Sequence, residues 1–367
     1  MKPSFLAALP FWASLLFLPM VWAGAVYGSP MISLTCIYVV VVFSALDLVT
    51  GNSNAGLDPA SRAGGLFWYR LITLIWLPIQ LVLIFGTLWW IQSTAHLSQG
   101  ETVALMASIG LISGVGGIVY AHELMHQSNR IERGLGEALM ITVLYGHFVT
   151  EHLRVHHRFV GTPKDAATAR YNESFYHFLP RVLFQSLVSA WRVEADLQRQ
   201  RGRPILHRSN PFWRYLGGAA TCLILAYGIG GIEAVILYLV QAGVAIFVLE
   251  QINYVEHYGL VRQRRGPGRY EPVAPHHSWN ADHRATNYLL INLQRHSDHH
   301  VKPARRFPVL QTYAAREAPQ LPAGYPLMVL LSYNPWLWRR VMNPRVRKWR
   351  TMFYPEITDW RPEVTGG

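Results

Sequence analysis

The sequence predicts an all-α membrane protein with six transmembrane helices and a cytoplasmic, histidine-rich site for two metal ions. Two observations lead to this prediction: long uninterrupted apolar runs, and histidines gathered just beyond the ends of these runs. The chain is 51% hydrophobic and only 15% charged, whereas soluble domains average about 25% charged residues. So much apolar sequence excludes a disordered chain. The two cysteines, Cys36 and Cys222, are too few for a disulfide framework.

A membrane-spanning helix needs about 20 mostly apolar residues. The first qualifying stretch looks like a signal peptide, but a second follows after a few residues, so we interpret the two as an uncleaved helical hairpin. The whole chain, 1–367, is expected to form one integral-membrane domain. Six stretches meet the requirement: 6–27, 31–49, 67–92, 102–120, 213–230 and 232–252.

The positions of the lysines and arginines predict the orientation of these spans. Nearly all of the basic residues lie in two segments, 121–212 and 257–367, while the links near 93–101 and 228–231 contain none. Basic loops stay on the cytoplasmic side of a membrane, so both segments and both termini are expected in the cytoplasm. The net charge of +12 therefore reflects topology, and we expect no nucleic-acid partner.

Nine of the sixteen histidines follow the ends of apolar runs with spacings typical of metal ligands. His122 and His126 are four residues apart, which places both imidazoles on one helix face. The segment EHLRVHH (151–157) repeats this pair and adds a neighbour, LQRHSDHH (293–300) has spacings of three and four, and His257 ends the last run. The nine are His122, His126, His152, His156, His157, His257, His296, His299 and His300.

Clusters with this spacing rarely arise from packing alone, whereas isolated histidines such as His96, His177 and His207 are ordinary structural residues. Imidazole binds Zn, Cu, Fe and Ni, so the residue type leaves the metal open. One zinc ion takes three or four protein ligands, but nine imidazoles can hold two ions with positions left open. Two such ions beside a bilayer indicate O2 activation and attack on a lipophilic C–H bond.

Two other functions fit part of the pattern. Residues 122–126 match H-E-x-x-H, the motif of zinc peptidases, in which Glu123 would be the general base. This function leaves seven histidines unexplained. A metal transporter would hold its ligands deep inside the spans, whereas these histidines lie at the span ends.

Four segments resemble the histidine boxes of the bacterial integral-membrane alkane 1-monooxygenases: HELMH (122–126), EHLRVHH (151–157), NYVEHYGL (253–260) and LQRHSDHH (293–300). More loosely, they resemble the fatty-acid desaturase and hydroxylase superfamily. The last two boxes favour an alkane hydroxylase over the related hydroxylases of aromatic methyl groups or fatty acyl chains. All nine histidines match the family's ligands.

The resemblance implies a non-haem di-iron centre in a bacterial inner membrane. It also implies hydroxylation of the terminal methyl group of medium- to long-chain n-alkanes to 1-alkanols, with O2 as co-substrate. Two electrons would come from a rubredoxin, with rubredoxin reductase and NADH upstream. The basic residues of the cytoplasmic segments include Arg262, Arg264, Arg265, Arg305 and Arg306, and part of this charge is expected to steer the acidic carrier.

Metal-bound imidazoles usually donate their second ring N–H to a carboxylate, which sets the tautomer. Carboxylates within or beside the boxes are candidates for this role. Within the boxes these are Glu123, Glu151, Glu256 and Asp298, and nearby are Asp165 and Asp282.

The apolar run before His122 is rich in glycine. We interpret these glycines as points of close helix packing. The alternative is that the missing side chains leave room for a straight substrate, which must enter from the bilayer because alkanes barely dissolve in water. The positions are Gly110, Gly114, Gly116 and Gly117.

Overall fold

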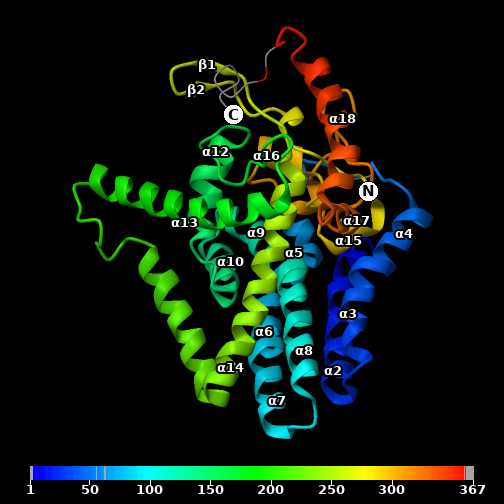
Figure 1. Ribbon diagram of the computed structural model, residues 1–367, viewed down its shortest axis with the longest axis vertical. Coiled ribbons are helices and arrows are strands. Elements are labelled where there is room, and N and C mark those ends of the chain that lie inside the picture. The colour runs from blue at the N-terminus through cyan, green and yellow to red at the C-terminus, as the bar shows by residue number, and fades with distance from the viewer. Residues whose placement is uncertain (1–2, 55, 62, 359, 361–367) are drawn as a thin grey trace.

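The computed structural model describes residues 3–54, 56–61, 63–358 and 360, so residues 359 and 361–367 of the predicted segment 257–367 lie outside the description. Within the described ranges, five helices are long and apolar enough to cross a membrane, and they fill the lower half of Figure 1. Many of their outward side chains are large and apolar, such as Val82 at 67% and Ile224 at 70% exposed. An extended apolar surface of this kind marks contact with lipid, so the chain is a multi-pass membrane protein. The five helices are Phe5–Tyr27, Met31–Thr50, Gly64–Thr94, Gln99–Met125 and Phe212–His257.

Each of the first four candidate spans is a series of helical segments that follow one another directly. The fourth span begins with a reciprocal cap, because the Ser98 hydroxyl accepts from the backbone of Glu101 while the Glu101 carboxylate accepts from the backbone of Ser98. The segments are α1 (Phe5–Ala8), η1 (Leu9–Leu16) and α2 (Phe17–Tyr27); η2 (Met31–Ser33), α3 (Leu34–Cys36), η3 (Ile37–Val42) and α4 (Phe43–Thr50); η4 (Ala63–Leu66), α5 (Phe67–Leu74), α6 (Trp76–Leu81), η5 (Val82–Gly86) and α7 (Thr87–Thr94); and α8 (Gln99–Ile112), η6 (Ser113–Ile118) and α9 (Val119–Met125).

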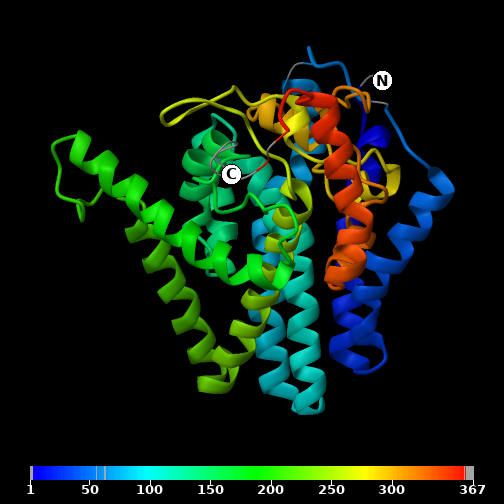
Figure 2. The same cartoon turned by 45° about the horizontal axis from the view of Figure 1, so that its top comes forward.

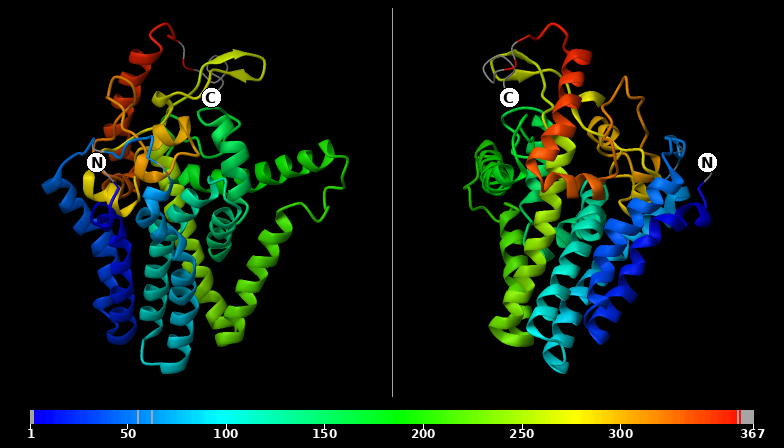
Figure 3. Two further views of the ribbon diagram at one scale, coloured as in Figure 1. Left: turned by 180° about the vertical axis from the view of Figure 1, so that it is seen from behind. Right: turned by 45° about the vertical axis from the view of Figure 1, so that its right-hand side comes forward.

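The ranges 213–230 and 232–252 were predicted as separate spans and form the two arms of one element, α14 (Phe212–His257). The helix breaks at Gly230 and Gly231, and Gly231 has a φ of +61°, a conformation that glycine adopts without steric cost. The chain turns back at this point, as the views in Figures 1 and 3 show. The two arms are therefore joined by a helix break and not by a loop.

The remaining elements lie mainly at the upper end of the bundle in Figure 1, where the segment after α14 covers the ends of the spans (Figure 2). One long helix, α13 (Phe175–Gln200), lies across the direction of the spans. In the described part of the chain, the all-α prediction is confirmed apart from one small hairpin and two isolated β-bridges. The other elements are α10 (Arg130–Thr142), α11 (Phe148–Glu151), η7 (His152–His156), α12 (His157–Phe159), β1 (Arg264–Gly266), β2 (Arg269–Tyr270), η8 (Pro275–His277), α15 (Arg284–Leu289), α16 (His296–Val301), η9 (Phe307–Val309), α17 (Tyr325–Ser332) and α18 (Pro335–Phe353).

The glycines before His122 bring the fourth span close to its neighbours. A Cβ atom added at Gly110 would lie 2.5 Å from the backbone oxygen of Gln241 in α14, and one at Gly116 would lie 2.9 Å from the Trp76 ring. Close packing is therefore confirmed at these positions. Gly114 also packs against α14, but it lines a cavity as well.

Candidate metal centre and cavity

The structure brings all nine predicted histidines together at the upper end of the bundle, on segments near α9, α12, α14 and α16 (Figure 1). They form two groups, and within each group the ligand nitrogens all lie within 4.8 Å of one another. The prediction that the four boxes converge on one site is confirmed. The first group is His122, His126, His152, His157 and His299, and the second is His156, His257, His296 and His300.

The nitrogen spacings in the first group are those of ligands around a single ion. The Nε2 atom of His152 lies 3.0 Å from Nε2 of His126 and 3.0 Å from Nε2 of His157. The Nε2 atoms of His157 and His299 are 3.1 Å apart. Metal–imidazole bonds are about 2.0–2.1 Å long, so two nitrogens on one ion are roughly 2.9–3.4 Å apart.

The second group has the same spacing. The Nε2 atom of His300 lies 2.9 Å from Nε2 of His296 and 3.3 Å from Nε2 of His156. The Nε2 atoms of His296 and His257 are 3.2 Å apart. Each group therefore offers several imidazole nitrogens around a common point.

The division of the second box between the groups differs from the sequence prediction. The sequence pairs His152 with His156 because α-helical residues four apart share a face. In the structure this box is a π-helical turn, with a backbone hydrogen bond from the N–H of His157 to the carbonyl of His152. The i→i+5 bond brings His157 into the group of His152, while His156 joins the other group.

Burial keeps these imidazoles in the form that binds metals. The pKa values of His152, His157, His299 and His300 are all lowered well below the usual value, first by burial and then by the neighbouring imidazoles. The rings are therefore neutral at physiological pH. Neutral imidazoles present nitrogen lone pairs without positive charge, and such a group of lone pairs can bind a metal cation.

The donor set fits a metal ion in each group. The Nε2 atom of His122 is buried in the first group without a hydrogen-bond partner among the described residues, as expected for a lone pair directed at an ion. All nine donors are imidazoles, which suit iron, zinc, copper or nickel. The histidine clusters and the chemistry of their donors together indicate a metal cofactor.

Asp165 is the carboxylate partner of the His156 ring. Its Oδ2 atom lies 3.0 Å from Nδ1 of His156 and also accepts a hydrogen bond from the Thr168 hydroxyl. Burial favours a higher pKa for Asp165, but His156 and these hydrogen bonds lower it below the usual value. The charged carboxylate therefore keeps the His156 proton on Nδ1 and leaves Nε2 free for a metal.

Glu256 was predicted to accept from the outer nitrogen of a metal-binding ring, but it lies beside Nε2 of His296, the nitrogen that faces the other histidines. One oxygen accepts a 2.8 Å hydrogen bond from the Tyr325 hydroxyl, and the other lies 3.3 Å from Nε2 of His296. Nε2 is the nitrogen that faces the second group, whereas Nδ1 of His296 is buried without a partner among the described residues. Glu256 is thus beside the metal-facing edge of the ring.

The other predicted carboxylates hold different parts of the site. Glu123 accepts hydrogen bonds from the backbone of Phe307 and the side chain of Gln127, each 3.1 Å long. Both oxygens of the Glu123 carboxylate are therefore engaged with other parts of the chain. Glu151 is buried, both of its oxygens have no partner among the described residues, and burial raises its pKa well above the usual value.

Asp298 and Asp282 serve the loops around the site. Asp298 pairs with Arg305 at 2.6 Å and accepts hydrogen bonds from the Tyr313 hydroxyl and the Gln311 backbone. The backbone carbonyl of Asp282 accepts from Ser53. Asp298 therefore fixes the loop that follows α16.

A third cluster of possible ligands, Glu271, His276 and His277, is explained by hydrogen bonding. The backbone N–H of Ala274 donates to Nδ1 of His277, so the proton of this ring is on Nε2, which donates to Glu271 at 3.1 Å. Tyr354 also donates to Glu271. With its Nε2 protonated, His277 is a structural clamp and not a ligand.

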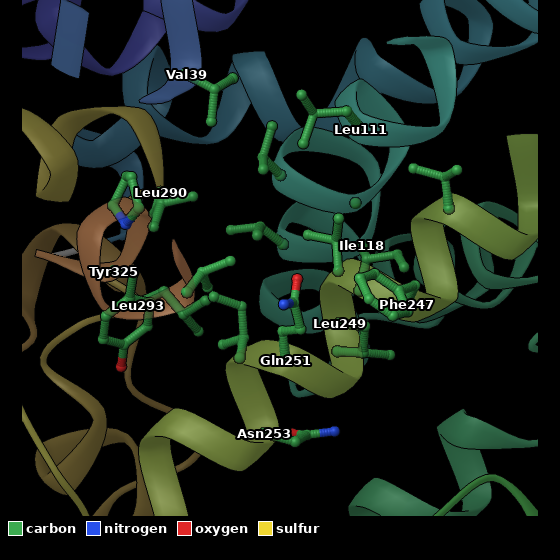
Figure 4. A pocket seen from close by; sticks show the side chains of 18 of the residues that line it. Val39, Leu111, Ile118, Phe247, Leu249, Gln251, Asn253, Leu290, Leu293 and Tyr325 are labelled. Atoms are coloured by element: carbon green, nitrogen blue, oxygen red, sulfur yellow. The ribbon is translucent and has the colours of Figure 1, made fainter. Parts of the chain in front are cut away.

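A largely apolar cavity of about 470 Å³ ends at the two histidine groups. His122 and His152 of the first group and His296 of the second line its inner end, and Figure 4 shows its wall of Val, Leu, Ile and Phe side chains. Exposed residues Cys36 and Tyr333 also line it, so the cavity reaches the surface of the molecule. Cys36 belongs to the second candidate span, which places this end at membrane depth.

Comparison with known proteins gives a consistent result. The family model for fatty acid desaturases matches residues 99–332, a range that contains all nine histidines. Alkane 1-monooxygenase 2 of Pseudomonas aeruginosa is 38% identical over 318 residues, which cover 86% of this chain and 84% of that protein. Alkane 1-monooxygenase 1 of the same organism is 39% identical over 310 residues, 82% and 79% of the two chains. The hydroxylase component of a Pseudomonas putida xylene/toluene monooxygenase is 27% identical over 300 residues, 80% and 78% of the two chains.

Proposed function

The chain belongs to the alkane 1-monooxygenase family, within the wider fatty acid desaturase family, and from this premise we propose the reaction of this membrane alkane hydroxylase in detail. It hydroxylates the terminal methyl group of medium- to long-chain n-alkanes, consumes O2 and two electrons, and releases a 1-alkanol. Its cofactor is a non-haem di-iron centre with one iron ion in each histidine group. The electrons come from a rubredoxin, reduced in turn by rubredoxin reductase and NADH.

The observation that carries this proposal is the apolar cavity that ends at both histidine groups. A cavity of this volume is within the range of small-molecule sites, and its few polar groups suit a hydrocarbon. An alkane dissolved in the bilayer enters through the end lined by Cys36 and Tyr333 and lies along the cavity with one methyl group beside His122 and His296.

The side chains of the protein hold the metal ions, orient the substrate and exclude water. Two bound iron ions would supply O2 activation. The nine imidazoles hold them, Asp165 sets the tautomer of His156, and the apolar walls exclude water and position the terminal carbon. The cavity thereby presents the terminal carbon of the alkane, and not its interior carbons, to the metal centre. An alkane has no polar group by which it could be oriented, so this selection depends on shape.

The electron donor is expected to dock on the basic surface near the first group. His126 and His157 are partly exposed, and Arg158 and Lys302 beside the boxes are exposed. An acidic carrier would be steered to positive charge of this kind. Arg262, in contrast, is buried and donates to a backbone carbonyl, and Arg305 pairs with Asp298, so these two arginines contribute little to this surface. This surface belongs to the segments predicted to be cytoplasmic in a bacterial inner membrane.

The test combines metal analysis with product analysis of the purified, reconstituted protein. We expect one iron ion for each histidine group, and conversion of n-octane to 1-octanol that requires rubredoxin, rubredoxin reductase and NADH together. Omission of rubredoxin alone should stop product formation. Zinc in place of iron, or hydroxylation of xylene but not of octane, would contradict the proposal.

The length of the cavity predicts a chain-length variant. Ala107 lines the cavity fifteen residues before His122, roughly 22 Å along a helix that rises 1.5 Å per residue. In Ala107→Phe the added ring shortens the cavity at this end, so turnover of n-hexadecane should fall about tenfold while that of n-octane changes less than about twofold. Competition between the two alkanes, followed by gas chromatography, measures the ratio.

A neighbouring residue provides the control for this variant. Ala104 is one turn earlier on α8 and exposed, so Ala104→Phe adds the same ring outside the cavity. It should leave the ratio of long-chain to short-chain turnover unchanged. Equal ratios in Ala107→Phe and the wild type would show that this part of the cavity does not hold the alkane.

A further inference from the structure

Gln251 places a polar group in the wall of the largely apolar cavity. The side chain is completely buried, at 0% exposed, and lines the cavity from the second arm of α14. Its Oε1 atom accepts a 3.2 Å hydrogen bond from the Tyr333 hydroxyl, whereas its Nε2 atom has no partner among the described residues. Figure 4 shows the amide extending from α14 toward apolar side chains such as Ile118.

A buried donor of this kind requires an acceptor. Natural proteins pair nearly all of their buried polar groups, because an unsatisfied amide loses its hydration without compensation. The Tyr333 bond holds Oε1, and Figure 4 shows the amide end of Gln251, which carries the free N–H groups, among the side chains that line the cavity. An n-alkane has no acceptor atom. A matching ligand has an apolar chain, to fill the cavity, and one oxygen.

We propose that the cavity contains a second binding position, in which the hydroxyl oxygen of a medium-chain 1-alkanol accepts a hydrogen bond from Nε2 of Gln251. The inference rests on the proposed function in one respect, that a 1-alkanol is the product formed beside this position. The alcohol class follows from the geometry: a single donor in an apolar slot suits one neutral oxygen, and Gln251 offers no positive charge for a carboxylate.

The position lies between the metal groups and the bilayer. Gln251 is five residues before Glu256 on the same helix, roughly 8 Å along its axis, and Glu256 is the residue 3.3 Å from His296. Its partner Tyr333 is exposed and lines the outer part of the cavity. The new hydroxyl group can therefore leave the histidines and remain hydrogen-bonded on its way out. A 1-alkanol also competes with the next alkane for the same space.

The test measures binding without turnover. Iron-loaded protein in lipid nanodiscs, with no electron donor, is titrated with radiolabelled 1-octanol or n-octane, and uptake by empty nanodiscs is subtracted. Replacement of Gln251 by Met keeps the length of the side chain and removes the donor. We expect the Kd of 1-octanol to rise about tenfold and that of n-octane to change less than about twofold.

Two further variants complete the experiment. Gln251→Leu repeats the test with another apolar residue, and the iron content and thermal midpoint of each variant confirm that it folds. Gln198 is the matched control, because it is also completely buried with no partner for its Nε2 among the described residues, but it lies on α13 away from the cavity lining. Gln198→Met should therefore bind both ligands as the wild type does.

The outcomes separate this inference from the proposed function. An unchanged Kd for 1-octanol, or an equal change for both ligands, would overturn the inference, and the equal change would mean that Gln251 only shapes the wall or holds a water molecule. If Gln251→Met weakens the binding of 1-octanol but not of n-octane, the result supports the inference even if the wild-type protein does not hydroxylate octane. In that case the proposed reaction fails while the binding position stands.

Discussion

Replacement of His300 with alanine is expected to reduce alkane turnover by at least about a hundredfold and to remove the iron ion that we propose for the second histidine group. His300 is central to this group, since its Nε2 atom lies 2.9 Å from that of His296 and 3.3 Å from that of His156. The group has four imidazoles, so the variant keeps three and loses the ligand that links the others. The first group is untouched and should retain its ion.

Iron per chain, measured by mass spectrometry on purified protein, and octane turnover together check this expectation. His207 is the matched control, because it lies outside both groups and its Nδ1 atom pairs with the Ser209 hydroxyl. His207→Ala should keep the full iron content and activity. If His300→Ala retained wild-type iron, the assignment of the second group as a metal site would be wrong.

Replacement of Asp165 with asparagine is expected to weaken metal binding by the second group about 10- to 100-fold. Asp165 is buried and lies 3.0 Å from Nδ1 of His156. Because its pKa is lowered below the usual value, the carboxylate stays charged at neutral pH and stabilises the proton on Nδ1. An amide has no charge and can also donate, so the His156 proton can move to Nε2, where it blocks the metal.

The affinity is measured by competition with a chelator, and octane turnover should fall with it. Asp196 is the control, since its ion pair with Arg199 is exposed, with 61% and 62% of the two side chains accessible. Asp196→Asn should change neither measurement. Wild-type metal affinity in Asp165→Asn would mean that His156 is oriented by packing alone.

Much of the fold follows from local sequence. Apolar runs of sufficient length must be helical in a bilayer, because backbone groups have no water to pair with there, and this rule locates the five candidate spans of the described residues. The glycines at 230 and 231 mark the turn between the last two runs. That these two runs form one broken helix was not predictable, because a two-residue link can be either a loop or a helix break.

The sequence predicts which histidines form the site, but it does not predict how they divide into two groups. The spacing of histidines on helices identifies the nine, and the structure brings the same nine together. Their assignment to two groups depends on the π-helical turn at His152–His156, which no residue type signals. Similarly, Asp165 and Glu256 lie beside histidines while Asp298 pairs with Arg305, although the sequence offers all three as candidates for the same role.

The sequence by itself determined that this is a helical membrane protein with nine histidines clustered at the ends of its spans, because hydropathy and helical spacing are local properties. Only the tertiary structure decided how these histidines divide into two groups, which carboxylate lies beside which ring, and that Gln251, whose Nε2 has no partner among the described residues, lies in the wall of the cavity. These depend on distances between segments far apart in the chain, and such distances are set by packing.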